Sequence, residues 1–280
     1  MQIINKIKQR FSYFLHGAPQ AIYANVTLLA PNKSLTGKRV IITGGGRGLG
    51  FAMAKKFVSE GAEVLIAGRN EETLKKASSE IKCKYVVLDV MDVDSFDEFL
   101  DTCEMLMPNA NCLVNNAGIS LHEGRFMDVT KESFDTQMIT NLRGSYFMAQ
   151  KFINRVVKKH IAANVLFISS EKGIFVDNMP YGLTKCSINS LAQALSCEFI
   201  KKSIRVNVLA PGVTTSDMTG RKEDGSLYAS YNVNGRLYIP SEVAEVANFL
   251  LSDASSCLSG QIIATNEGKT VNNPLEIKMF

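Results

Sequence analysis

The chain has 280 residues, 46% of them hydrophobic and 21% charged, and its formal net charge is +4 at pH 7. These values are typical of a globular protein that buries a sizeable core. The charge is too small to indicate nucleic-acid binding, and no patch of basic and aromatic residues accompanies it. No apolar run approaches the roughly 20 residues that a membrane-spanning helix needs.

The cysteines and histidines do not form a recognisable metal site. The six cysteines include no CxxC pair, and His16, His122 and His160 lack the spacing of metal ligands. We expect reduced and buried thiols, no bound metal and a cytoplasmic location.

Residues 1–36 are predicted to form an extension ahead of one domain over residues 37–280. Apolar side chains recur on one helical face of residues 1–15, and basic residues lie among the other positions. Such a helix either covers an apolar groove on this subunit or its neighbour, or lies on a membrane surface. We favour the packed helix.

From residue 38 onward, predicted strands and helices alternate. Short apolar runs such as Val64-Leu65-Ile66-Ala67 suit a parallel sheet covered by helices on both faces. We therefore expect a single Rossmann-type α/β domain with a doubly wound parallel sheet of about seven strands. The predicted strands are 39–43, 63–67, 84–88, 111–115, 164–169, 204–209 and 261–265. The predicted helices are 48–59, 70–80, 93–105, 131–159, 181–202 and 241–251.

A glycine-rich turn joins the first predicted strand to the first helix, where Thr43 to Gly50 read TGGGRGLG. In a strand–turn–helix unit, glycines let the backbone approach a pyrophosphate that the N–H groups of the helix N-terminus bind. This segment predicts nucleotide binding. The least regular stretch, 213–239, follows a later strand, and we expect it to act as a lid or substrate loop.

Tyr181 and Lys185 lie four residues apart at the start of a predicted helix, so both side chains project from the same face. The pKa of a free tyrosine is about 10, and a nearby ammonium lowers it. The hydroxyl then becomes a usable general acid or base for a carbonyl–alcohol pair.

Further motifs occur in a characteristic order along the chain. They are the glycine turn, Asn115-Asn116-Ala117-Gly118, Asn141 before Gly144, Ser169-Ser170 before Gly173, Tyr181 before Lys185, and Pro211-Gly212. With these motifs, residues 37–270 resemble the short-chain dehydrogenase/reductase family, and within it the β-ketoacyl-(acyl carrier protein) reductase-like branch. The ending Asn266-Glu267-Gly268 departs from the family's usual Asp-Gly-Gly.

The resemblance implies the catalytic residues. Tyr181 matches the acid/base, Lys185 the residue that holds the nicotinamide ribose, and Asn141 the asparagine that supports a proton-relay water through a helix distortion. For the serine, the distance along the chain to Tyr181 slightly favours Ser169, whereas the usual spacing to the following glycine selects Ser170. Neighbouring strand residues face opposite sides, so only one serine faces the substrate, and we choose Ser170.

The resemblance also implies which residues contact the cofactor, from the pyrophosphate at the glycine turn to the nicotinamide at residues 211–214. The expected contacts are Thr43, Gly44, Arg47, Gly48, Leu49, Gly50, Arg69, Asp89, Val90, Asn116, Ala117, Gly118, Tyr181, Lys185, Pro211, Gly212, Val213 and Thr214. Family members that prefer NAD carry an acid near the end of the second strand. Here Arg69 stands beside that position and Arg47 lies in the glycine turn, and guanidinium groups suit a 2′-phosphate.

We therefore expect NADPH/NADP, with NAD(H) as the alternative if both arginines are solvated and balanced by Glu71 and Glu72. The predicted function is reduction of a ketone or 3-oxoacyl carbonyl to a secondary alcohol, with Tyr181 as general acid. The alternatives are a sugar or sterol dehydrogenase on the same scaffold, or a non-catalytic NADP(H)-binding sensor or scaffold. Besides a small-molecule substrate, the expected partners are further copies of the chain in a homodimer or homotetramer.

Overall fold

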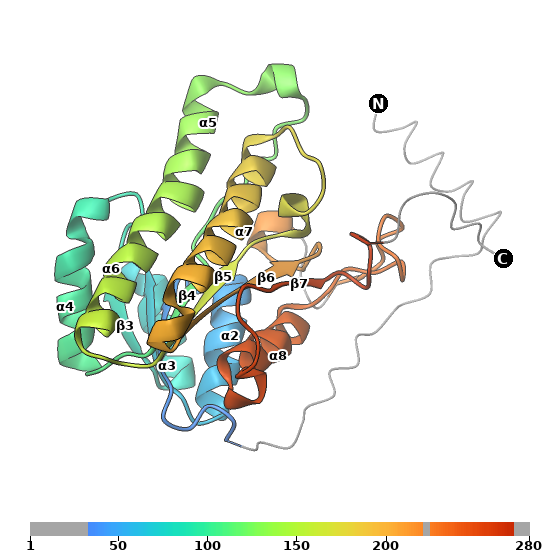
Figure 1. Cartoon of the computed structure of the whole chain (residues 1–280). Coiled ribbons are helices and arrows are strands. Elements are labelled where there is room, and N and C mark those ends of the chain that lie inside the picture. Colours follow the sequence, from blue (N-terminus) through green and yellow to red (C-terminus); the bar gives the residue numbers. More distant parts are fainter. Residues whose placement is uncertain (1–32, 221–224, 272–280) are drawn as a thin grey trace.

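The computed structural model describes residues 33–220 and 225–271, so the predicted helix over residues 1–15 lies outside the described residues. Within these ranges, parallel strands form one seven-stranded sheet in the order β3-β2-β1-β4-β5-β6-β7 (Figure 1). The strands are β1 (Arg39–Thr43), β2 (Glu63–Gly68), β3 (Lys84–Val87), β4 (Cys112–Asn115), β5 (Ala163–Ile168), β6 (Ile204–Pro211) and β7 (Ile262–Thr265). The prediction of one doubly wound parallel sheet is confirmed.

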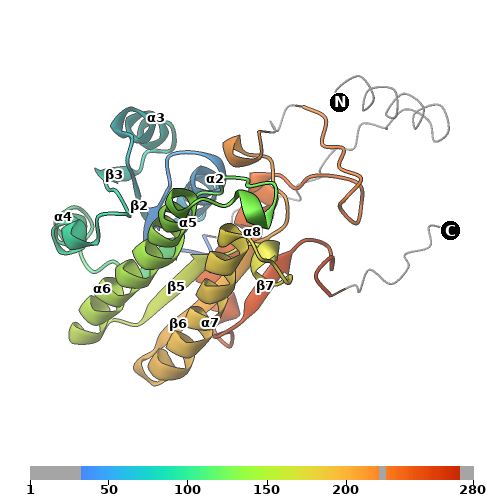
Figure 2. The same cartoon turned by 90° about the horizontal axis from the view of Figure 1, so that it is seen from above.

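Helices cover both faces of the sheet because its strands are apolar on both sides. One core is closed by α4 (Phe96–Leu106), α6 (Gly144–Lys158) and α7 (Pro180–Phe199). The other is closed by α2 (Gly48–Ser59), α3 (Glu71–Ile81) and α8 (Pro240–Leu251) (Figures 1 and 2). Leu35 is fully buried in this second core, ahead of the predicted domain start. No helix among the described residues is long and apolar enough to cross a membrane.

The structure departs from the predicted elements in two places that bear on function. The predicted helix 131–159 is divided into α5 (Lys131–Gln137), a π-helical turn (Met138–Arg143) and α6. Strand β6 runs two residues further than predicted and ends at Pro211, which pairs with Thr265 of β7. Strand β5 ends opposite Leu209, so no residue of β5 lies opposite Pro211. The proline, which has no N–H group, therefore costs the sheet no hydrogen bond on this side.

The expectation of buried thiols is wrong for half of the cysteines. All six are free, but Cys186, Cys197 and Cys257 are exposed because they lie on the outer surfaces of α7 and the turn after α8. The buried thiols include Cys112, where the loss of solvent raises the pKa to about 12.

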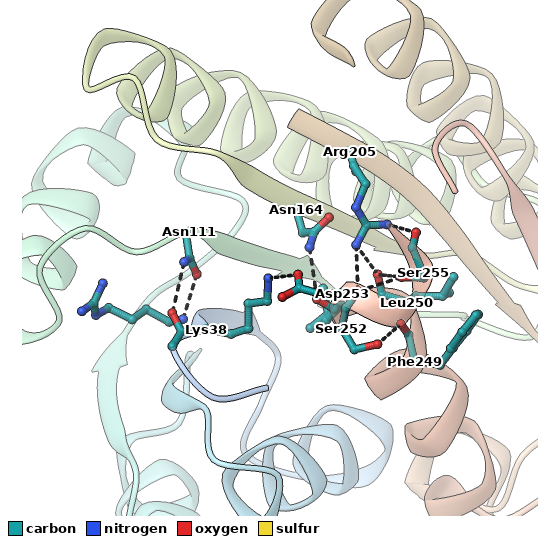
Figure 3. Close-up of polar contacts among 12 residues, drawn as sticks. Lys38, Asn111, Asn164, Arg205, Phe249, Leu250, Ser252, Asp253 and Ser255 are labelled. Atoms are coloured by element: carbon teal, nitrogen blue, oxygen red, sulfur yellow. Dashed lines mark hydrogen bonds and ion pairs between the residues drawn. The ribbon is translucent and has the colours of Figure 1, made fainter. Parts of the chain in front are cut away.

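Polar side chains close the amino end of the sheet (Figure 3). The Arg205 guanidinium donates hydrogen bonds of 2.8–3.2 Å to carbonyl oxygens at and after the end of α8, which are those of Leu250, Ser252, Ser255 and Leu258. Asn164 donates to the Leu251 carbonyl at 3.1 Å, and Lys38 pairs with Asp253 at 2.6 Å. The bonds from Arg205 and Asn164 satisfy carbonyl groups at the end of the helix and in the turn after it. The chemistry-bearing motifs lie at the opposite, carboxyl end.

Candidate active site

The glycine turn after β1 lies beside the loop after β4, at the point where the strand order reverses. Asn116 Nδ2 donates to the carbonyl oxygens of Thr43 and Gly44, at 3.0 Å each. In return, Thr43 Oγ1 accepts bonds from the N–H groups of Asn116 and Ala117, at 3.1 Å each. A Cβ on Gly50 would lie 2.1 Å from the Gly44 carbonyl oxygen, so only glycine lets α2 start this close to the turn.

The N-terminus of α2 is open to an anion. Its N-cap residue, Arg47, makes no side-chain cap, and no acidic residue lies in the first turn. Two other helices that start near the surface differ, since Asn70 caps α3 and Thr130 caps α5 with side-chain oxygens. An uncapped helix start behind a glycine turn is the arrangement that binds a pyrophosphate, so these residues fit the expected dinucleotide.

The residues expected at the adenosine end lie on the surface beside this turn. Arg47, Arg69 and Asp89 are exposed, and Asp89 Oδ1 accepts a bond from the Met91 N–H at 2.9 Å. Val90 is partly buried against the start of α6. Glu71, a candidate counter-charge for Arg69, pairs instead with Lys75 at 3.0 Å, and this lowers the pKa of Glu71.

Tyr181 and Lys185 project from the first turns of α7 toward the end of β5. Lys185 Nζ donates to the Ile168 carbonyl at 2.8 Å and lies 5.6 Å from the centroid of the Tyr181 ring. Complete burial lowers the pKa of Lys185 to about 8. Desolvation of the hydroxyl raises the pKa of Tyr181, and a hydrogen bond with Ser170 opposes this shift only in part. The sequence predicts a lowered pKa for Tyr181, but in the structure burial raises it.

The two serines at the end of β5 face different partners. Ser169 is 4% exposed, and its Oγ donates to the Lys185 carbonyl at 3.2 Å. Ser170 interacts with the Tyr181 hydroxyl and acts to lower the pKa of Tyr181, and its Oγ accepts a bond from the Lys172 N–H at 3.2 Å. Gly173 permits the turn to approach α7, because a Cβ there would lie 2.7 Å from the Lys185 carbonyl carbon. The structure therefore brings Ser170, rather than Ser169, together with Tyr181.

Asn141 lies in the π-helical turn and is completely buried. Its Oδ1 accepts a bond from the Ile119 N–H at 2.8 Å, and its Nδ2 donates to the Ile119 carbonyl at 2.9 Å and to Thr184 Oγ1 at 3.2 Å. A Cβ on Gly118 would lie 3.2 Å from Asn141 Oδ1 and 3.5 Å from Lys185 Nζ. The asparagine thus holds the loop after β4 against α7.

The segment after β6 crosses over the glycine turn. Thr214 Oγ1 donates to the Gly212 carbonyl at 2.9 Å, and the Val213 carbonyl accepts a bond from the Tyr238 N–H at 3.1 Å. Further on, Ser216 Cβ lies 3.9 Å from where a Cβ on Gly48 would stand.

A histidine joins this segment to the loop after β4. The Nε2–H of His122 donates to the Met218 carbonyl at 2.7 Å. This bond helps to hold the segment as a cover over the glycine turn, where we expect the cofactor.

Sequence reasoning missed Thr184, His122 and the buried Glu171. Thr184 anchors Asn141, and Glu171 is 3% exposed directly after Ser170, with Lys269 Nζ at 2.9 Å from its carboxylate. The signal that could have identified Glu171 is the acidic residue inside the Ser-Ser-x-x-Gly turn. The described residues contain no group of His, Cys, Asp and Glu that could hold a metal ion.

Comparisons with known proteins agree with this geometry. Residues 44–270 match the family model described as enoyl-(acyl carrier protein) reductase. The chain is 32% identical over 250 residues to a tropinone reductase homologue of Arabidopsis thaliana, covering 85% of this chain and 95% of the relative. It is 32% identical over 247 residues to the 3-oxoacyl-(acyl-carrier-protein) reductase of Chlamydia muridarum, with coverages of 85% and 99%.

A dehydrogenase relative and a solved structure extend these matches. The gluconate 5-dehydrogenase of Gluconobacter oxydans is 30% identical over 253 residues, which cover 85% of this chain and 97% of the relative. The solved structure of a short-chain type dehydrogenase/reductase from Mycobacterium ulcerans matches with a TM-score of 0.78 at 27% identity, covering 85% of this chain and 91% of that one.

Proposed function

Because this chain belongs to the short-chain dehydrogenase/reductase family and is an NAD(P)-dependent oxidoreductase, we propose that it uses NADPH to reduce a ketone or 3-oxoacyl carbonyl to a secondary alcohol. The observation that carries the proposal is that Tyr181 lies beside both Ser170, which acts to lower its pKa, and the buried Lys185, whose Nζ is 5.6 Å from the centroid of its ring. The Chlamydia relative, named as a reductase of a 3-oxoacyl group, supports this substrate class.

In this reaction the nicotinamide supplies the hydride when it is bound. The Ser170 hydroxyl donates a hydrogen bond to the carbonyl oxygen as negative charge develops there, and the Tyr181 hydroxyl donates its proton to the same oxygen. Because burial raises the pKa of Tyr181, this hydroxyl keeps its proton at neutral pH, which suits the reducing direction. Lys185 and Asn141 hold Tyr181, the proton donor, in position. They also provide the route by which its hydroxyl regains a proton after the reaction.

The preference for NADPH rests on the charges at the adenosine end. Arg47 and Arg69 are exposed beside the uncapped start of α2, and Glu71 is paired with Lys75. With no carboxylate at the end of β2 to bind a ribose diol, a 2′-phosphate is the better ligand for these guanidinium groups.

The proposed reaction is tested by Tyr181→Phe. Removing the hydroxyl that donates the proton is expected to lower kcat by roughly 10²- to 10⁴-fold, with NADPH affinity unchanged. Steady-state oxidation of NADPH with 3-oxoacyl thioesters, keto-sugars and a diketone measures kcat, and fluorescence titration measures cofactor affinity.

Tyr146→Phe is the matched control, because Tyr146 is 43% exposed on α6 and has no proposed part in the reaction. It should turn over like the wild type. Full activity of Tyr181→Phe would rule out the proposed proton donor.

Cofactor choice is tested by Arg69→Ala. Loss of its charge-assisted hydrogen bonds to the 2′-phosphate is expected to weaken NADPH binding by about 10- to 100-fold and to leave NADH binding unchanged. Lys76→Ala removes another exposed positive charge, from α3, and serves as the control. Equal losses for both cofactors would contradict a phosphate contact.

Sugar oxidation or reduction is the second candidate, and the gluconate 5-dehydrogenase among the relatives favours it. The keto-sugar arm of the same assay decides between the two substrate classes. A sensor without catalysis is disfavoured, because the relatives are named as reductases and dehydrogenases and this chain keeps both Tyr181 and Lys185.

A further inference from the structure

Residues 227–238 form a short hairpin, which we call the hairpin segment. The Leu237 N–H donates to the Leu227 carbonyl and the Ala229 N–H to the Gly235 carbonyl, both at 2.7 Å. The segment follows the cover over the cofactor end and leads into α8, so it lies at the carboxyl end of the sheet, where the substrate is expected. Tyr228 and Tyr231 are exposed on it.

The turn after β7 reaches both the hairpin segment and the turn after Ser170. Lys269 Nζ donates to Glu171 Oε1 at 2.9 Å and to Asn232 Oδ1 at 3.1 Å, and it lies 5.7 Å from the centroid of the Tyr231 ring. A single ammonium therefore joins segments that are far apart in the sequence.

Glu171 is the buried end of this connection. Its side chain is 5% exposed, and its second oxygen accepts a bond from Asn266 Nδ2 at 3.3 Å. A buried carboxylate is unfavourable without a charged or hydrogen-bonding partner, so Glu171 needs Lys269. The backbone carbonyl of Glu171 accepts bonds from the N–H groups of Ile174 and Phe175, at 3.0 Å each. These bonds fix Glu171 in the turn that begins at Ser170, so a contact of its carboxylate also holds this turn.

A second contact joins the same turn to the hairpin segment. Glu267 has a φ of +54°, in the left-handed region that favours glycine. Its carboxylate accepts a bond from the Tyr238 hydroxyl at 3.2 Å and lies 3.5 Å from Arg236. The side-chain contacts give a reason for a glutamate at a position where the backbone favours glycine.

We propose that Glu171 is a positioning residue that sets substrate specificity: its ion pair with Lys269 clamps the hairpin segment against the turn that carries Ser170. The inference rests on the proposed function, because it takes Ser170 as the residue that orients the substrate carbonyl. The clamp thereby holds the hairpin segment, which we expect to line the substrate site, at a fixed distance from the Ser170 turn. Glu171 itself touches no reacting atom.

Amide hydrogen exchange of the hairpin segment tests the clamp without any substrate. In Glu171→Gln and in Lys269→Met, the amides of Ala229 and Leu237 are expected to exchange about tenfold faster or more, because the hairpin opens when its anchor is lost. Lys269→Arg keeps the charge and should restore slow exchange. Lys172→Met removes a neighbouring lysine whose 57% exposed side chain pairs with Asp177 at 3.5 Å, outside the hairpin segment, and should leave exchange of the hairpin amides slow.

Exchange that stays slow in both clamp variants would overturn the proposal, whatever their activity. If Glu171→Gln does not fold, exchange in Lys269→Met alone tests the clamp. The Lys269 side chain is 24% exposed, so its replacement is expected to be tolerated by the fold. The double variant should behave like either single variant, because both remove the same pair. Fully additive effects would contradict a shared clamp.

Kinetics then separate positioning from simple stabilisation. The clamp variants are expected to raise KM for the carbonyl substrate by about tenfold and to change kcat much less. They should also reduce the ratio of kcat/KM between long and short carbonyl substrates. Unchanged KM and unchanged selectivity with a loosened hairpin would overturn the specificity role. A wild-type protein that reduces no carbonyl would refute the proposed function instead, and the exchange result would still decide the clamp.

Discussion

Lys185 is a charged side chain placed where the fold removes almost all of its water. It is 4% exposed, and its Nζ donates to the Ile168 carbonyl at 2.8 Å. Burial lowers the pKa of Lys185 from 10.5 to about 8, which corresponds to a cost of about 3 kcal/mol for the charged form in the folded protein. A residue that costs stability in this way is typical of a site selected for function.

Lys185→Met is therefore expected to abolish turnover and to stabilise the protein at pH 7 by about 2 kcal/mol, after about 1 kcal/mol is lost with the hydrogen bond. The folded pKa is the lower one, so between about pH 8 and 10.5 the unfolded chain binds more protons than the folded one. Wild-type stability thus rises through this window, and the advantage of the variant shrinks. Urea unfolding at pH 7 and at about pH 9.5 measures both effects, with the exposed Lys76→Met as control. A variant less stable than wild type at pH 7 would contradict the desolvation argument.

The π-helical turn between α5 and α6 sets the position of Asn141 relative to α7. Its C-terminal neighbour, Gly144, begins α6 against the loop after β3, and a Cβ there would lie 2.5 Å from the Val90 carbonyl oxygen. The helix approaches this loop only because residue 144 has no side chain. The π-helical turn thereby connects the loop after β3, where we expect the adenine, with α7, which carries Tyr181 and Lys185.

Gly144→Ala is expected to destabilise the protein by about 1–3 kcal/mol, because the overpacked contact outweighs the roughly 1 kcal/mol that alanine gains in a helix. Activity should fall as well, since α6 and the turn that carries Asn141 must shift. Thermal and urea unfolding measure the change. Gly124→Ala is the control, because its nearest atom would be Asp128 Oδ2 at 3.8 Å. Equal stability of both variants would contradict the steric argument.

The molecule as a whole presents apolar side chains on the outer surfaces of α6 and α7. Tyr146 on α6 is 43% exposed and Leu183 on α7 is 42% exposed. These long helices are the surfaces through which we propose that copies of the chain associate. Burying such side chains between copies removes apolar area from water and favours association.

Light scattering is expected to give the mass of a dimer or tetramer at micromolar concentration. Leu183→Glu should shift the protein toward smaller species, because an unpaired carboxylate is costly in an interface. Met127→Glu places the same charge on a different exposed apolar residue, 87% exposed, and should leave the mass unchanged. A monomeric wild type would refute the oligomer.

At the scale of the fold, the alternation of short apolar runs with amphipathic helices determined the doubly wound sheet, because a parallel strand must be apolar on both faces. The motif order determined the family, since TGGGRGLG, Tyr181 and Lys185 each carry a local chemical requirement. These features are properties of neighbouring residues, so the chain alone discloses them.

Only the tertiary structure decided which of two identical neighbours, Ser169 or Ser170, lies with Tyr181. It also reversed the expected direction of the Tyr181 pKa and joined Glu171 to Lys269, 98 residues further along the chain. Desolvation depends on every atom that surrounds a group, and a long-range ion pair depends on how distant segments pack. Neither quantity is encoded in the spacing of local motifs, so both become visible only in the folded chain.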